Sequence, residues 1–142
     1  RNPRILHEGV LRADSVALRN TTVHLGDFTL AEPYISKDTF VYFDPPYRPL
    51  NQTSSFTQYS KDRFTDEEQE RLAAFYAQCD ARGASLMLSN SDPKNIDPDD
   101  EFFDDLYAGY HIDRVPARRT INCDGTKRGK IHEIIVTNYS RV

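Results

Sequence analysis

The chain has 142 residues, of which 38% are apolar, 11% aromatic and 28% charged. These values are ordinary for a protein with one packed core. No stretch approaches the roughly 18 to 20 apolar residues that a membrane-spanning helix needs, and the first residues lack the apolar run of a signal peptide. The two cysteines, Cys79 and Cys123, have no short spacing, which argues against a disulfide framework and a zinc site. We therefore expect a cytoplasmic protein with reduced thiols and no metal.

The net charge of −4 neither supports nor excludes a nucleic-acid partner, because the distribution of charge matters more than its sum. Acidic residues gather at residues 66–70 and 97–105. Basic residues gather in the last third of the chain, at Arg114, Arg118, Arg119, Lys127, Arg128 and Lys130. An ordinary solvated surface explains this pattern as well as a binding surface does.

A helix is predicted near the start of the chain. Over residues 4–20, apolar residues recur at spacings of four and three, which places them in one stripe on a helix. These residues are Leu6, Val10, Ala13 and Ala17. The β-branched and apolar run at residues 22–25 predicts a short strand that ends at Gly26.

Residues 39–43 are β-branched and aromatic without strict alternation, which predicts a strand buried on both faces of a parallel sheet. Asp44-Pro45-Pro46 ends that strand, because proline cannot donate to a ladder. Residues 48–64 then show no helical or strand period. A connection of this length is usually functional or disordered, and its aromatic residues argue against plain disorder.

The next helix is predicted from Thr65, which forms a capping-box pattern with Glu68. Its buried stripe consists of Leu72, Phe75, Tyr76 and Cys79, and Gly83 stands where a glycine ends a helix. Residues 84–88 predict a buried strand that stops at Ser89-Asn90.

The last third of the chain predicts a short helix over residues 99–107, closed by Gly109, and strands over residues 110–115 and 131–138. A basic loop, residues 116–130, joins the two strands, so they are expected to be antiparallel neighbours. Strands that alternate with helices imply a mostly parallel sheet. The expected fold is α/β, with a Rossmann-like sheet and a C-terminal antiparallel hairpin.

One motif, Asp44-Pro45-Pro46-Tyr47, falls at the carboxyl end of a predicted strand, where open α/β sheets bind ligands. The sequence around it resembles the Dam-type adenine-N6 DNA methyltransferases of the alpha group. The resemblance covers about residues 22–139. It is carried by 40–47, 49–50, Thr53, 56–57, Tyr59, 64–65, 88–90, 118–119, 127–130 and 133–139.

The resemblance implies a role for each matching residue. Asp44 and a carbonyl of Pro45-Pro46 would hold the amino group of a flipped adenine, and Tyr47 would stack on that base. Asp27 and Phe28 would contact the adenine ring of S-adenosylmethionine, with Asp44 also beside this cofactor. Without the resemblance, Asp27 would simply cap a turn. The matching residues expected at duplex DNA are Thr53, Phe56, Tyr59, Arg118, Arg119, Lys127, Arg128 and Lys130.

The chain departs from the family pattern in its first part. It has no Phe-x-Gly-x-Gly cofactor loop, no acidic residue for the ribose and no target-recognition insert before Gly26. We therefore expect residues 1–142 to be the C-terminal part of one catalytic domain, whose sheet lacks its first strands and whose partner is the missing N-terminal half. Such a fragment would associate with itself or rearrange its first segment, and would bind S-adenosylmethionine weakly.

Three hypotheses remain at this point. The first is a fragment of a DNA adenine-N6 methyltransferase from a restriction–modification or Dam-like system, for which the resemblance suggests a GATC target. The second is a methyltransferase that acts on RNA or on protein glutamine. The third is a non-catalytic remnant or nucleic-acid-binding module that uses the basic loop.

Overall fold

The computed structural model describes residues 7–49, 64–118 and 130–140, and the chain divides into two compact units, residues 1–30 and 31–142. In the first unit, α1 (Glu8–Ala17) continues into a 3-10 turn, η1 (Leu18–Asn20). The predicted helix is therefore confirmed over residues 8–17. None of its residues is buried, and Val10 and Leu11 are exposed.

The strand predicted at residues 22–25 is wrong. These residues form neither a strand nor a helix, and Val23 and Leu25 are 85% and 101% exposed. An isolated strand leaves its backbone groups without ladder partners, and no described strand pairs with this segment. Another 3-10 helix, η2 (Phe28–Tyr34), follows Gly26 and Asp27.

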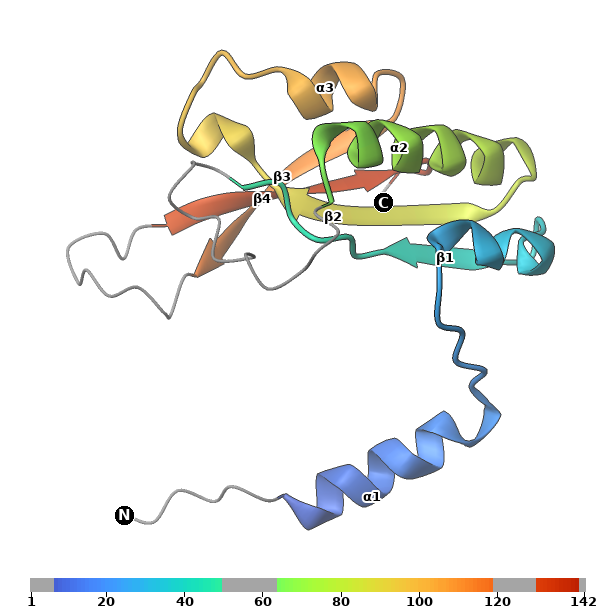
Figure 1. Ribbon diagram of the computed structural model, residues 1–142. Coiled ribbons are helices and arrows are strands. Elements are labelled where there is room, and N and C mark those ends of the chain that lie inside the picture. Colours follow the sequence, from blue (N-terminus) through green and yellow to red (C-terminus); the bar gives the residue numbers. More distant parts are fainter. Residues whose placement is uncertain (1–6, 50–63, 119–129, 141–142) are drawn as a thin grey trace, which may run out of the picture. The chain divides into compact units, whose positions relative to one another are not determined.

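The second unit contains a four-stranded sheet in the order β1-β2-β4-β3 (Figure 1). Its strands are β1 (Phe40–Phe43), β2 (Ser85–Ser91), β3 (His111–Arg118) and β4 (Lys130–Thr137). β1 and β2 are parallel, whereas β4 is antiparallel to both β2 and β3. The predicted terminal hairpin is thus confirmed. β3 tolerates Pro116 because it lies at the edge of the described sheet, where a strand can spare a donor.

Helices α2 (Asp66–Ala81) and α3 (Phe102–Leu106) lie on the same face of the sheet (Figure 1). The predicted stripe of α2 is buried in full, with Tyr76 at its centre against the rings of Phe43 and Tyr107. The helix begins after Thr65 and is followed by Gly83, which has a φ of +82°, as predicted. The capping box itself is absent, since the Thr65 side chain makes no capping bond and Glu68 pairs with Arg71.

The opposite face of β1 is open, so the prediction of a strand buried on both faces is wrong. Phe43 is 7% exposed, but Phe40 and Tyr42 are 57% and 53% exposed. Successive side chains of β1 point to opposite faces, and the described helices α2 and α3 cover only one of them, so only the side chains on that face are buried. β2 also differs from expectation, because it continues through Ser89 and Asn90 to Ser91.

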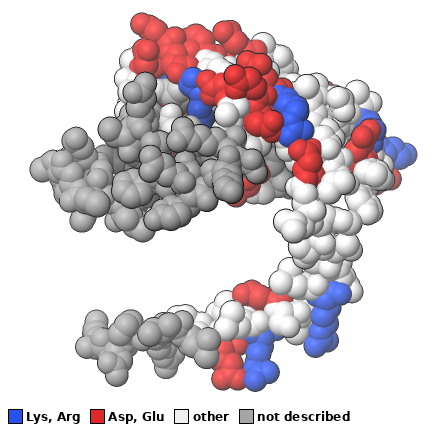
Figure 2. All heavy atoms as spheres, viewed as in Figure 1, with Lys and Arg blue, Asp and Glu red and all other residues white. Residues whose placement is uncertain are grey.

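The described part of the second unit is a mixed α/β structure consistent with a methyltransferase-like fold. A third short 3-10 helix, η4 (Pro93–Asn95), follows β2, and α3 forms within the predicted range 99–107. Acidic side chains gather over α3 and the start of α2 on the face that Figure 2 shows. Among the described residues, no helix is long and apolar enough to cross a membrane.

Candidate active site at the carboxyl end of β1

The motif Asp44-Pro45-Pro46-Tyr47 leaves β1 directly beside the end of β2. The two strands are parallel, with Phe43 opposite Leu88, so Ser89, Asn90 and Ser91 of β2 extend alongside the motif. Successive side chains of a strand point to opposite faces. Ser89 therefore reaches the motif from the open face of the sheet, and Asn90 reaches it from the helix-covered face.

On the open face, Ser89 holds the carboxylate of Asp44. Ser89 Oγ donates to Asp44 Oδ1 at 3.2 Å, and it lies 2.9 Å from the hydroxyl of Tyr42. A serine hydroxyl has one proton, so the Tyr42 hydroxyl must be the donor of the second bond. Ser89 is 2% exposed, whereas Asp44 is exposed. Ser89 thus fixes one carboxylate oxygen of Asp44, while the Asp44 side chain remains accessible.

Tyr47 presents a partly exposed ring, with a relative exposure of 38%. Its hydroxyl donates to Glu133 Oε2 over a long 3.5 Å. Desolvation by burial raises the pKa of Tyr47, and the charges of Glu133 and Asp44 add to this shift. Tyr47 therefore stays a neutral phenol at physiological pH, which suits contact with an uncharged aromatic ligand.

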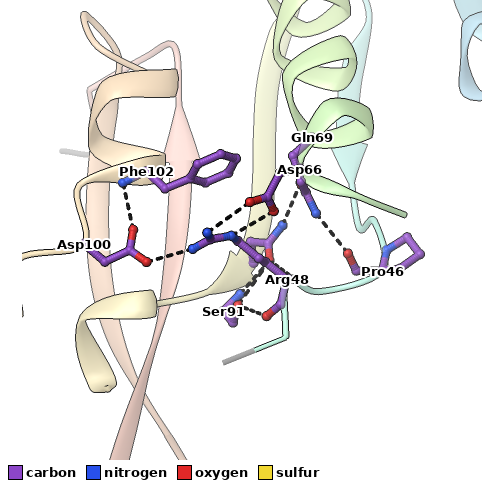
Figure 3. Close-up of polar contacts among 8 residues, drawn as sticks. Pro46, Arg48, Asp66, Gln69, Ser91, Asp100 and Phe102 are labelled. Atoms are coloured by element: carbon purple, nitrogen blue, oxygen red, sulfur yellow. Dashed lines mark hydrogen bonds and ion pairs between the residues drawn. The ribbon is translucent and has the colours of Figure 1, made fainter. Parts of the chain in front are cut away.

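Arg48 anchors the chain directly after the motif (Figure 3). Its guanidinium donates twice to Asp66, at 2.9 and 3.0 Å, and once to Asp100 at 2.8 Å. It also lies 4.3 Å from the ring centroid of Phe102. These bonds raise the pKa of Arg48, chiefly through the hydrogen bonds with Asp66. A bidentate guanidinium–carboxylate pair has a fixed geometry, so Arg48 ties the motif to the starts of α2 and α3.

The main chain on either side of Tyr47 is bound by two side chains that the sequence did not single out as a pair. Gln69 Nε2 donates to the Pro46 carbonyl at 3.1 Å, and the backbone N–H of Arg48 donates to Asn90 Oδ1 at 3.0 Å. The sequence signal for Gln69 is its position: it stands three residues before Leu72, on the apolar stripe of α2, where a polar residue requires a partner.

Two of the three residues predicted at the cofactor, Asp27 and Phe28, lie in the first unit of the chain, whereas the third, Asp44, lies in the second. Asp27 Oδ1 accepts the backbone N–H and the hydroxyl of Thr29, at 3.0 and 2.6 Å, and so caps the start of η2. This is the local role that the sequence left open for Asp27. The ring of Phe28 is partly exposed. A carboxylate and a neighbouring aromatic ring suit an adenine base, because the carboxylate can accept from its amino group and the ring can pack on its flat face.

Most residues predicted at DNA lie outside the described residues, namely Thr53, Phe56, Tyr59, Arg119, Lys127 and Arg128. Arg118 and Lys130 are opposite each other where β3 and β4 meet the basic loop, so their backbones are neighbours. Arg114 differs from these basic residues, because Asp92 and Asp104 accept its bonds at 3.2 and 2.6 Å. Arg114 is therefore a structural cation of the acidic face.

A mixed α/β sheet with this motif at the end of a parallel strand is consistent with a methyltransferase-like fold. Comparison with known families agrees. The model of the D12 class N6 adenine-specific DNA methyltransferase family matches residues 1–121. The chain belongs to this family.

Curated relatives carry names of the same chemistry. The chain is similar to the Type II methyltransferase M.MjaIII of Methanocaldococcus jannaschii, with 49% identity over 98% of this chain and 46% of the relative. It is similar to the Type II methyltransferase M1.LlaDCHI of Lactococcus lactis subsp. cremoris, with 39% identity over 98% of the chain and 47% of the relative. It is also similar to the DNA N-6-adenine-methyltransferase of Escherichia phage P1, with 34% identity over 78% of the chain and 14% of the relative. The chain thus spans slightly less than half the length of the first two relatives.

Proposed function

We propose that this chain supplies the catalytic residues of a site-specific DNA adenine-N6 methyltransferase. The enzyme transfers a methyl group from S-adenosylmethionine to an adenine that has been flipped out of duplex DNA. One observation carries the proposal: the motif presents both a carboxylate and an accessible aromatic residue. Asp44 is held by Ser89 at 3.2 Å, and Tyr47, three residues later, is exposed. The family and the names of the relatives favour DNA adenine over RNA or protein glutamine as the substrate.

Asp44 and a main-chain carbonyl act on the amino group of the target adenine. The lone pair of that amino group is delocalised into the ring, so the nitrogen must become pyramidal before it can attack a methyl carbon. Two acceptors that bind its two N–H bonds favour this shape. The carboxylate of Asp44 is one acceptor. Gln69 already occupies the Pro46 carbonyl at 3.1 Å, which favours the Pro45 carbonyl as the other.

The acceptors act mainly by being in place before the substrate arrives. The ring of Pro45 fixes its φ near −65°, and Pro46 restricts the ψ of Pro45, so the direction of the Pro45 carbonyl is set by the chain. Ser89 fixes the carboxylate of Asp44 in the same way. Such preorganisation stabilises the positive charge that develops on the nitrogen as the N–C bond forms. The proton that the nitrogen then carries leaves after transfer, to Asp44 or to water.

Tyr47 gives the flipped base a flat apolar surface. Base–aromatic stacking is worth about 1–3 kcal/mol per base in proteins that bind single strands. The neutral state of the Tyr47 phenol supports this role, because it brings no charge against the face of the base.

S-adenosylmethionine, when bound, supplies the electrophilic methyl group on its sulfonium. Asp27 and Phe28 remain the proposed contacts of its adenine ring, with the carboxylate accepting from the amino group and the phenyl ring packing on the base. Because the chain spans less than half of its first relatives, the cofactor site of the complete enzyme is expected to include residues outside this sequence, among them a glycine-containing loop.

Duplex DNA is the proposed partner, with phosphate contacts from Arg118, Lys130 and the basic residues of the loop between them. Phosphate contacts position the protein and carry no sequence information, and their strength falls as salt increases. The acidic face over α3 is an unfavourable surface for DNA, which supports an approach from elsewhere on this unit (Figure 2).

The decisive experiment measures methyl transfer to duplex DNA by the complete enzyme and by its Asp44→Ala variant. We expect the variant to lose transfer while S-adenosylmethionine binding, measured by calorimetry, is retained. Asp38→Ala is the matched control, because Asp38 is an exposed carboxylate just before the same strand. Transfer by Asp44→Ala at the rate of the Asp38→Ala control would contradict the proposed role.

A further inference from the structure

Two buried amide side chains, Gln69 of α2 and Asn90 of β2, connect the main chain on one side of Tyr47 to the main chain on the other. Figure 3 shows the bond between Gln69 and Pro46. We propose that Gln69 and Asn90 are positioning residues for the target base: they fix the backbone that carries Tyr47, and so set where the base stacks. This inference rests on the function proposed above and concerns the same site.

The connection is continuous. Gln69 Nε2 donates to the carbonyl of Pro46 at 3.1 Å, and Gln69 Oε1 accepts from Asn90 Nδ2 at 3.2 Å. Asn90 Oδ1 then accepts the backbone N–H of Arg48 at 3.0 Å. The two peptide groups that flank Tyr47 are therefore joined by one chain of hydrogen bonds through two side chains.

The direction of this chain is fixed by its ends. Asn90 Oδ1 meets two backbone N–H groups, those of Arg48 and Ser91, at 3.0 and 2.8 Å, so this atom must be the oxygen of the amide. Asn90 consequently offers its NH₂ group to Gln69, which accepts with its own oxygen. The NH₂ group of Gln69 then faces the Pro46 carbonyl, an obligatory acceptor. Reversal of either amide would break bonds at both of its ends.

Burial makes the chain rigid and costly to disturb. Gln69 and Asn90 are each 0% exposed. A buried polar group that loses its partner destabilises the fold, since no water replaces the bond. Downstream, Ser91 Oγ donates to the Arg48 carbonyl at 2.7 Å, and the guanidinium of Arg48 is bound to Asp66 and Asp100. The backbone on both sides of Tyr47 is thus held, while the residue remains 38% exposed.

A purely structural role would not require amides here. Gln69 lies on the buried stripe of α2 with Leu72 and Tyr76. An apolar side chain at position 69 would pack in this stripe without a desolvation cost. The amide at this position binds one backbone carbonyl of the motif and one side chain at the end of β2, and both contacts lead to the segment around Tyr47. The desolvation cost of burying the Gln69 amide is therefore offset by hydrogen bonds that hold the segment around Tyr47.

A double-mutant cycle with Tyr47 tests the inference in the complete enzyme. Gln69→Leu removes both hydrogen bonds of this side chain and should lower kcat/KM for duplex DNA by about tenfold. In the Tyr47→Ala background the same substitution should change kcat/KM by less than about twofold, since the ring that it positions is gone. The KM for S-adenosylmethionine should stay unchanged in all variants.

The same variants can also be compared by fluorescence, with DNA that carries 2-aminopurine at the target position. With wild-type enzyme the flipped base should stack on Tyr47 and its fluorescence should be quenched, whereas Gln69→Leu should give a brighter complex. Asn90→Asp alters the other amide of this chain of hydrogen bonds. It keeps the acceptor for the Arg48 N–H and removes the donor to Gln69. It serves in the same cycle if Gln69→Leu does not fold.

Leu72→Ala is the matched control, because Leu72 is buried on the same helix, one turn further on, with 2% exposure. It should lower the melting temperature, leave the 2-aminopurine signal unchanged and combine additively with Tyr47→Ala. If Gln69→Leu and Asn90→Asp behave like Leu72→Ala, or have the same effect with and without the Tyr47 ring, the positioning role is wrong. A wild-type enzyme that methylates no adenine would instead contradict the proposed function.

Discussion

Ser89 donates a hydrogen bond to Asp44 across 3.2 Å, from the interior of β2 to the first residue after β1. A bond to an ionised group is worth about 1.5–3 kcal/mol, and a loss of 1.36 kcal/mol in transition-state stabilisation lowers a rate tenfold. We therefore expect Ser89→Ala to lower kcat for DNA methylation about tenfold, with little change in KM for either substrate. Steady-state kinetics measure this. Ser85→Ala, at the exposed start of the same strand, is the control, and a Ser89→Ala rate within twofold of it would refute the prediction.

Tyr47 should act through its ring and not through its hydroxyl. The hydroxyl makes a long 3.5 Å contact with Glu133, which contributes little. Tyr47→Phe should accordingly keep the KM for duplex DNA within about threefold, whereas Tyr47→Ala should raise it by about five- to 150-fold, as the loss of about 1–3 kcal/mol of stacking requires. Equal KM values for the two variants would show that the ring does not bind the base.

The acidic face should make the stability of the second unit depend on pH. Burial opposes ionisation of Asp104, but hydrogen bonds from Arg114 and Lys94 outweigh it and lower the pKa of Asp104 below the ordinary 3.8. A depressed folded-state pKa stabilises the fold above the unfolded-state value, and this stabilisation is lost as pH falls through the folded-state value. The free energy of unfolding in urea should therefore fall below about pH 4, and Asp104→Asn should reduce that slope. An unchanged slope in Asp104→Asn would assign the acid sensitivity to other carboxylates.

The glycine after α2 should be difficult to replace. Gly83 has a φ of +82°, and an added Cβ would lie 3.3 Å from Lys37 Cβ. Gly83→Ala should lower the free energy of unfolding by about 1 kcal/mol or more, from the left-handed backbone and the close contact together. Gly109→Ala separates the two causes, because Gly109 has a φ of +94° and nothing within 4 Å of an added Cβ. Urea unfolding should show the larger loss for Gly83→Ala, and an equal loss would assign the whole effect to the backbone.

The local pattern of the sequence was sufficient for most helices and strands of the second unit. The apolar stripe from Leu72 to Cys79 and the glycine at 83 located α2, the β-branched runs located β1, β3 and β4, and the apolar run at residues 84–88 located β2. These signals are periodic or terminal, so they depend on neighbours along the chain. The strand at residues 22–25 failed because a strand depends on a partner in space, and the described sheet offers none to it.

The sequence by itself determined the family and the motif, since Asp44-Pro45-Pro46-Tyr47 and the ordered matches around it are properties of the chain as written. It did not reveal how the motif is held. Only the tertiary structure brought Gln69 and Asn90, which are 21 residues apart, into one hydrogen-bonded chain around Tyr47 and placed Ser89 beneath Asp44. The physical reason is that a buried polar side chain is satisfied by whichever group the fold brings within about 3 Å of it, and sequence spacing does not encode that distance.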